Sequence, residues 1–114
     1  MKTVLVVDDN VVIGRMTEAV LDLLGLNTIL CEGGKQAIPR ISEADALITD
    51  FLMPEMNGAE LVQEAKRQKP GMPALIITGT LADVPKDHLA DGVFGKPFYI
   101  EELHSWLRKM GIAE

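Results

Sequence analysis

The most informative part of the sequence is the stretch Ala46-Leu-Ile-Thr-Asp-Phe-Leu-Met-Pro-Glu-Met-Asn-Gly58. In it, a run of strand-like residues leads directly into one carboxylate, Asp50. Met53-Pro54 and Asn57-Gly58 then break the strand pattern. In open α/β sheets, ligands bind beside the carboxyl ends of the strands, where this aspartate would lie. Taken alone, an acid in such a place is also typical of a helix cap or a turn.

Other strand-like runs in the chain also end in polar side chains. Val4-Leu-Val-Val leads into Asp8-Asp9, Ala74-Leu-Ile-Ile leads into Thr78, and Val93-Phe-Gly leads into Lys96. If the strands are parallel, all of these groups point at one edge of one sheet. Packing alone does not explain that convergence, so the pattern predicts a functional site.

Helical patterns separate these strands along the whole chain. The expected strands are residues 3–7, 27–32, 45–51, 74–78 and 92–95. The expected helices are one of about 13 residues before Gly25, one over 35–43 disturbed by Pro39, one capped by Asn57 with Glu60, a short one after Pro85, and one from Phe98 to Gly111. This alternation predicts an α/β fold of three layers, with helices on both faces of one parallel sheet (α/β/α).

Five parallel strands with these crossovers match the flavodoxin-like order 2-1-3-4-5, here with a shortened fourth helix. In that order the topological switch point lies beside the first and third strands, which end in Asp8-Asp9 and Asp50. Three carboxylates on one rim repel each other, and a hard divalent cation with oxygen ligands is the usual remedy. Mg²⁺ is the natural candidate because it binds carboxylates and phosphoryl oxygens together.

Composition limits the class of protein. A chain of 114 residues with 47% hydrophobic and 25% charged residues fits one soluble domain. The formal charge of −6 argues against direct nucleic-acid binding. The lone Cys31, the lack of a signal peptide and the lack of a bilayer-length apolar run predict a cytoplasmic protein without membrane insertion.

From end to end, the sequence resembles a response regulator receiver domain of two-component systems. The residues that carry the resemblance are Asp8-Asp9, the stretch from Asp50 to Gly58, Thr78, and Lys96-Pro97 followed by Phe98. The resemblance implies a phosphoprotein of two-component or phosphorelay signal transduction, in which Asp50 accepts a phosphoryl group from a histidine kinase or a histidine phosphotransfer protein. The resulting aspartyl phosphate would switch binding to a downstream protein target.

The resemblance also assigns roles to the site residues. Asp8, Asp9, Asp50 and the backbone carbonyl of Leu52 would form the Mg²⁺ site, with Asp8 acting mostly through water. Asp50 would be the nucleophile, while Lys96 and Thr78 would bind phosphoryl oxygens, and Lys96-Pro97 would be a cis peptide. Such a domain phosphorylates itself from phosphodonors and slowly loses the group, so it is not expected to be a turnover enzyme.

The sequence departs from the family in two places. Val93 stands where the family has an aromatic residue that responds to the Thr78-type hydroxyl, and only 17 residues separate Thr78 from Lys96. We therefore expect Phe98, Tyr99 and the last helix to carry more of the partner recognition. Residues 1–114 are expected to form a single receiver domain with no output domain, acting as a phosphorelay shuttle, a target-binding regulator or a phosphate sink.

Three other classes of protein fit the sequence less well. A pseudo-receiver that signals without phosphorylation would not need the intact acids, Thr78 and Lys96. A phosphohydrolase with an aspartyl phosphate would need an acid two residues after Asp50, where this chain has Leu52. A flavin or nucleotide binder would need a glycine-rich phosphate loop after the first strand, which the chain lacks.

Overall fold

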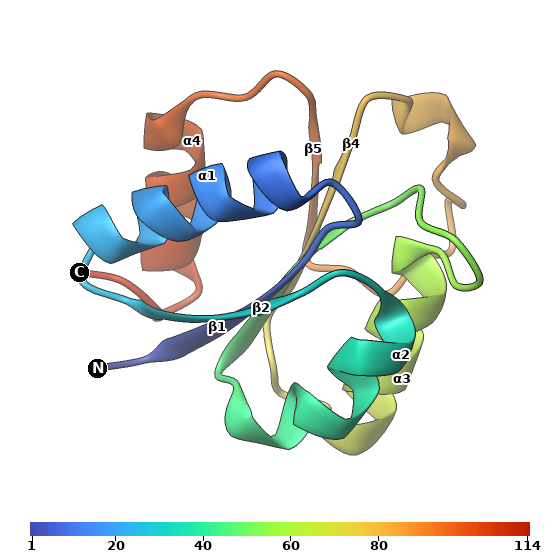
Figure 1. The fold of residues 1–114 in the computed structure, drawn as a ribbon, viewed down its shortest axis with the longest axis horizontal. Coiled ribbons are helices and arrows are strands. Elements are labelled where there is room, and N and C mark those ends of the chain that lie inside the picture. The colour runs from blue at the N-terminus through green and yellow to red at the C-terminus, as the bar shows by residue number, and fades with distance from the viewer.

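The fold is a five-stranded parallel sheet in the order β2-β1-β3-β4-β5, seen in a computed structural model that describes residues 1–114 (Figure 1). The predicted order is therefore confirmed. The strands are β1 (Thr3–Val7), β2 (Asn27–Cys31), β3 (Ala46–Asp50), β4 (Ala74–Thr78) and β5 (Gly92–Gly95). Only β2 and β3 are slightly shorter than the sequence predicts.

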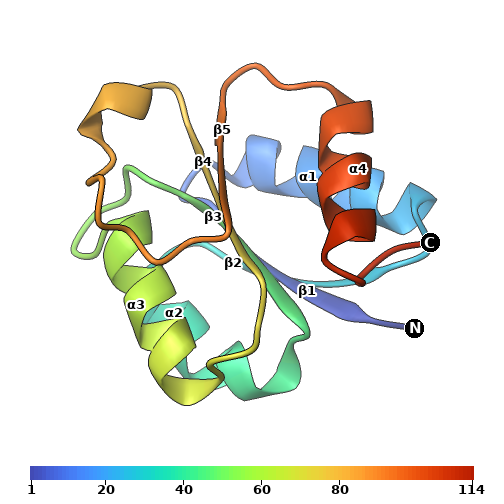
Figure 2. The same ribbon diagram turned by 180° about the vertical axis from the view of Figure 1, so that it is seen from behind.

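Helices cover both faces of the sheet. They are α1 (Val11–Leu23), α2 (Gly34–Ala37), α3 (Gly58–Gln68) and α4 (Ile100–Lys109), with a 3₁₀ helix over Ile38–Glu43. Helices α1 and α4 lie on one face, and α2 and α3 lie on the other, which gives the predicted three layers (Figures 1 and 2). None of these helices has the length and apolar character needed to cross a bilayer.

Local signals in the sequence explain several helix boundaries. The Asn10 side chain accepts hydrogen bonds from the backbone N–H groups of Val12 and Ile13, and this cap starts α1. Asn57 and Glu60 form the predicted capping box of α3, with both bonds at 2.9 Å. The second helical stretch changes from α to 3₁₀ geometry at Ile38, directly before Pro39.

The three central strands are buried on both faces, which is why they are continuous apolar runs in the sequence. On the face of α1 and α4, the core contains Val6, Ile48 and Ile77. On the face of α2 and α3, it contains Leu47 and Ile76. Each fully buried aliphatic side chain contributes roughly 1.5–3 kcal/mol, so this double burial makes the sheet a stiff support for its rim.

The connection between β4 and β5 corrects the sequence prediction. The shortening of the fourth helix is confirmed, but the only helix here is the 3₁₀ helix Leu81–Asp83, which precedes Pro85. The prediction of a short helix after Pro85 was wrong. That stretch holds only one hydrogen-bonded turn, from the His88 N–H to the Pro85 carbonyl. Too few residues remain before Gly92 for a helix and a return to the sheet. The chain therefore has four α-helices, not five.

A polar contact holds this connection in place without an α-helix. The Lys66 ammonium group on α3 donates to an Asp91 carboxylate oxygen at 2.7 Å and to the Met72 carbonyl at 2.8 Å. The same Asp91 oxygen accepts the Ala74 N–H at 2.9 Å. Because both side chains are partly shielded from water, this network ties the start of β5 to α3 and to β4.

Candidate functional site

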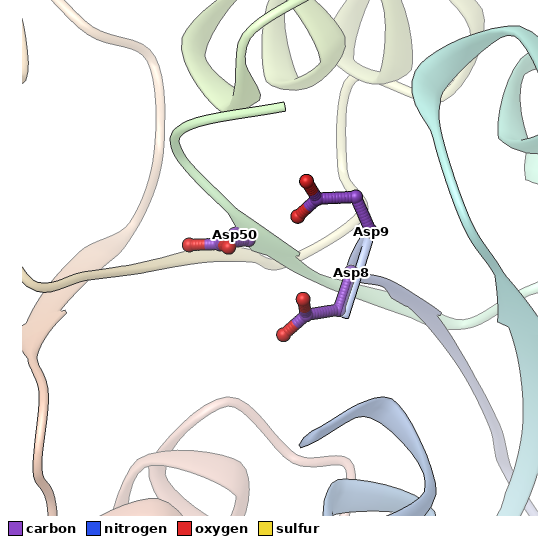
Figure 3. Close-up of side chains that lie close together, drawn as sticks. All are labelled: Asp8, Asp9 and Asp50. Atoms are coloured by element: carbon purple, nitrogen blue, oxygen red, sulfur yellow. The ribbon is translucent and has the colours of Figure 1, made fainter. Parts of the chain in front are cut away.

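The sheet brings three carboxylates together at the ends of β1 and β3. One oxygen from each of Asp8, Asp9 and Asp50 lies within 4.8 Å of the others. Figure 3 shows their carboxyl groups pointing to the same side of the two strand ends. The cause is the parallel pairing of β1 with β3, in which Val7 lies opposite Thr49. Both strands therefore reach their acidic residues at the same level of the sheet.

Asp8 is the most enclosed of the three acids. Its side chain is 8% exposed, and one carboxylate oxygen accepts the Asn10 N–H at 2.9 Å. Burial raises the pKa of the Asp8 carboxyl, the Asn10 N–H opposes this effect, and the nearby Asp50 carboxylate adds to the increase. Asp8 is thus a group whose negative charge needs further compensation.

Lys96 is the cation that the protein itself supplies. Its ammonium nitrogen lies 3.3 Å from Asp50 Oδ1 and 4.0 Å from Asp8 Oδ2. The following peptide bond, Lys96-Pro97, is cis, as the resemblance implies. The predicted meeting of Asp8, Asp9, Asp50 and Lys96 at one rim therefore occurs in the structure.

The backbone after β3 orients Asp50. The Phe51 N–H is shared between Asp50 Oδ1 at 2.9 Å and the Ile77 carbonyl at 3.1 Å. The Phe51 carbonyl in turn accepts the Gly58 N–H at 2.8 Å, which closes the loop onto the start of α3. A Cβ atom at Gly58 would lie 3.0 Å from Phe51 Cα and nearer still to the Asp50 carbonyl oxygen. Glycine at this position allows the close approach.

Thr78 lies at the same rim but is not bonded to the acids. It is 1% exposed, and its hydroxyl oxygen accepts the Thr80 N–H at 3.0 Å and lies 3.2 Å from the Thr80 hydroxyl oxygen. The side chains of Asp50 and Lys96, by contrast, line a small cavity with Val6, Ile48 and Ile77 on the face of α1 and α4. The structure thus places Thr78 next to the site and engages its hydroxyl elsewhere.

The donor set of the rim fits a hard divalent cation. Three carboxylates face one ammonium group, which leaves an excess of negative charge, and all the available ligands are oxygens. Such a set suits Mg²⁺ better than a soft metal. Leu52 lies in the loop after β3, and because its side chain is a hydrocarbon, only its backbone carbonyl can offer an oxygen to a metal.

An apolar groove of about 490 Å³ opens beside Lys96, between α1 and α4. Its lining is mainly hydrophobic and consists of Ile13, Met16, Thr17, Val20, Lys96, Pro97, Phe98, Ile100 and Leu103. Tyr99 and Ile100 are 75% and 51% exposed at the start of α4. An exposed apolar surface therefore adjoins the carboxylate rim.

Sequence reasoning missed the groups that support the site residues. The amides of Asn10 and Thr80 bond the side chains two residues before them, Asp8 and Thr78. Aspartate and threonine commonly form such turns with the amide two residues on, so Asp8 itself, at the end of a strand, was an available signal. The contact between the two threonine hydroxyls had no comparable signal.

A parallel α/β sheet with this rim of three acids and a lysine defines the class of receiver-type signalling domains. The family model for the response regulator receiver domain matches residues 4–108, and the chain belongs to that family of two-component systems.

Two curated relatives illustrate the match. The chain is 32% identical to the response regulator receiver protein CpdR of Brucella abortus, over 99% of both proteins. It is 33% identical to the probable transcriptional regulatory protein TcrX of Mycobacterium tuberculosis, over 97% of this chain. In that second case the chain spans only 52% of the relative's length.

Solved structures share the fold. The response regulator TrrA of Thermotoga maritima, in complex with Mg²⁺ and beryllium fluoride, is 27% identical with a TM-score of 0.86, and the match covers 96% of this chain and 99% of that one. The receiver domain of sensor histidine kinase PA1611 of Pseudomonas aeruginosa, with magnesium in its active-site cleft, is 26% identical with a TM-score of 0.86, over 96% and 98%.

We expect Gly58→Ala to destabilise the protein by about 1–3 kcal/mol, because the added methyl group must displace the backbone of Asp50 and Phe51. Urea denaturation followed by circular dichroism measures this change. Gly79→Ala is the matched control, since no atom lies within 4 Å of a Cβ atom built there. Equal unfolding midpoints for both variants would contradict the close approach.

Proposed function

We propose that this receiver domain accepts a phosphoryl group on Asp50 and that the modification switches its binding to a protein partner. The observation that supports this proposal is the position of Asp50, which is 12% exposed, lies 3.3 Å from the Lys96 ammonium group and shares its rim with Asp8 and Asp9. A nucleophile, a cation for phosphoryl oxygens and a metal-binding pair of acids are thus present together.

The contacts of Asp50 distinguish its two oxygens. Oδ1 faces both the Phe51 N–H and the Lys96 ammonium group, whereas Oδ2 has no protein partner. We assign Oδ2 as the oxygen that attacks phosphorus in a phosphohistidine. The new O–P bond forms as the P–N bond breaks, and the imidazole leaves with the electron pair and takes up a proton. Later hydrolysis of the acyl phosphate would restore the carboxylate.

Lys96 and the acidic residues would have different electrostatic roles in the transfer. The Lys96 ammonium group can pass from Asp50 Oδ1 to an oxygen of the transferred group, because the two positions are adjacent. Asp8, Asp9, Asp50 and the Leu52 carbonyl would hold Mg²⁺, as the resemblance implies. When bound, Mg²⁺ neutralises charge on the phosphoryl oxygens and relieves repulsion among the acids.

The protein would act as a phosphorylated switch and not as a turnover enzyme. Leu52 occupies the place where a phosphohydrolase would carry a proton-transferring acid. A pseudo-receiver remains the alternative, but it leaves the four charged groups at the rim without a role. We propose that the phosphoryl transfer takes place in the cytoplasm, where an unpaired cysteine such as Cys31 stays reduced.

Asp50→Asn is expected to abolish phosphorylation while preserving the fold. After incubation with acetyl phosphate and Mg²⁺, intact-mass spectrometry should show one acid-stable, hydroxylamine-labile phosphoryl group on the wild-type protein and none on the variant. Asp45→Asn, just before the opposite end of β3, is the matched control and should be phosphorylated normally, since its amide oxygen can still accept the Thr3 N–H. No phosphorylation of the wild-type protein would favour the pseudo-receiver alternative.

Substitutions of Asp9 and of Lys96 should have different effects on Mg²⁺ affinity. Asp9→Ala removes a carboxylate ligand and should weaken Mg²⁺ binding at least tenfold in a calorimetric titration, on the order of the loss of one metal ligand or its support. Lys96→Ala removes a competing positive charge, so Mg²⁺ affinity should stay the same or increase while phosphorylation-dependent output is lost. Unchanged Mg²⁺ affinity in Asp9→Ala would refute the ligand assignment.

The partner that donates the phosphoryl group would be a histidine kinase or a histidine phosphotransfer protein. A downstream protein would bind according to the phosphorylation state of Asp50. We expect Tyr99→Ala to slow transfer from a panel of phosphorylated phosphotransfer domains by about tenfold, because exposed aromatic anchors commonly dominate interfaces. Its rate with acetyl phosphate should not change. Leu23→Ala, 81% exposed at the far end of α1, is the control. Equal rates for Tyr99→Ala and the wild-type protein would remove Tyr99 from the interface.

A further inference from the structure

The Thr78 hydroxyl is buried, and both of its hydrogen-bond partners belong to Thr80. Buried hydroxyl groups are nearly always paired, so Thr80 satisfies a group that would otherwise be isolated from water. The Thr80 N–H can only donate, and it therefore uses one lone pair of Thr78 Oγ1. The second contact joins the two hydroxyl oxygens, whichever of them supplies the proton.

The Thr78 side chain and the Asp50 carboxylate belong to different faces of the sheet. Successive side chains of a strand point to opposite faces of the sheet. Ile77 packs in the core on the face of α1 and α4, so Thr78 belongs to the face of α3. The Asp50 carboxylate and Lys96 line the cavity on the Ile77 side. We infer that a hydrogen bond from Thr78 to a phosphoryl oxygen on Asp50 draws the Thr78 hydroxyl away from the Thr80 hydroxyl.

Thr80 is also connected to the segment that replaces the fourth helix. Its carbonyl accepts the Asp83 N–H at 3.0 Å, and Leu81 directly after it starts the 3₁₀ helix. The Leu81 side chain covers Gly95, where a Cβ atom would lie 3.3 Å from Leu81 Cδ1. Because Lys96 follows Gly95, the turn held by Thr80 contacts the backbone next to the site lysine.

The face of α3 has no aromatic side chain on β5 that would respond to a movement of Thr78. Val93 packs against the core on that face, and Phe94 packs on the opposite one, with its ring centroid 6.0 Å from that of Phe98. The side chain that contacts the Thr78 hydroxyl is instead that of Thr80, and the 3₁₀ helix Leu81–Asp83 follows it directly.

We propose that Thr80 is a positioning residue that holds the Thr78 hydroxyl in the unphosphorylated protein and competes for it with phosphorylated Asp50. Loss of the hydroxyl contact on phosphorylation frees the turn at residues 81–83 and shifts Leu81 on Gly95. This inference rests on the proposed function, because it needs a phosphoryl group, or its mimic, on Asp50.

Thr80→Val tests the competition, since valine keeps the shape and the backbone N–H but removes the hydroxyl. We expect it to bind beryllium fluoride, a phosphoryl mimic, roughly fivefold more tightly in the presence of Mg²⁺, as expected if one hydrogen bond worth about 1 kcal/mol no longer opposes binding. Thr80→Ser restores a hydroxyl and should behave like the wild-type protein. Thr78→Val should bind the mimic more weakly.

Methyl NMR of Leu81 supplies a second measurement. In Thr80→Val without the mimic, the Leu81 methyl signals should move toward their positions in the mimic-bound wild-type protein. Weaker or unchanged binding of beryllium fluoride by Thr80→Val would overturn the proposal, because a purely structural role for Thr80 predicts loss and not gain. Absence of binding by the wild-type protein would instead refute the proposed function of Asp50.

Discussion

Repulsion among three carboxylates at the ends of two adjacent strands is the constraint on which the rest of the structure depends. At 4.8 Å each pair of charges costs roughly 3–4 kcal/mol at an effective dielectric constant of about 20. Lys96 offsets part of this cost through Asp50 and Asp8, but one ammonium group cannot neutralise three acids. The rim is tolerated because the sheet beneath it is buried on both faces, and the remaining charge is what suits it to a divalent cation.

The same stiff sheet explains why the domain keeps its fold without an α-helix between β4 and β5. Helices normally cover a parallel sheet because its faces are apolar. Here β5 is a short edge strand, Val84 fills part of the core, and the contact of Lys66 with Asp91 ties the connection to α3. The domain thus gives up a helix at its edge, where the loss of burial is smallest, and keeps the strands that carry the site.

Strand alternation divides the site between the two faces of the sheet. Asp8, Asp50 and Lys96 work on the face of α1 and α4, next to the apolar groove, whereas Thr78 belongs to the face of α3. The proposed phosphoryl chemistry and the groove proposed for partner binding therefore share one side, and the proposed response to phosphorylation begins on the other. Val93 stands where an aromatic residue is expected, and we propose that the response instead acts through the short turn after Thr80.

The sequence by itself determined the strands, their order and the gathering of Asp8, Asp9, Asp50 and Lys96, because apolar runs and the polar residues that end them are local signals that parallel pairing brings to one edge. It also determined the capping box of Asn57 with Glu60. Only the tertiary structure decided the position of the 3₁₀ helix relative to Pro85, the groove beside Phe98 and the partner of the Thr78 hydroxyl. A hydroxyl group can bond many neighbours, and which one it meets depends on the face of the sheet and on the path of the next loop, which no residue spacing records.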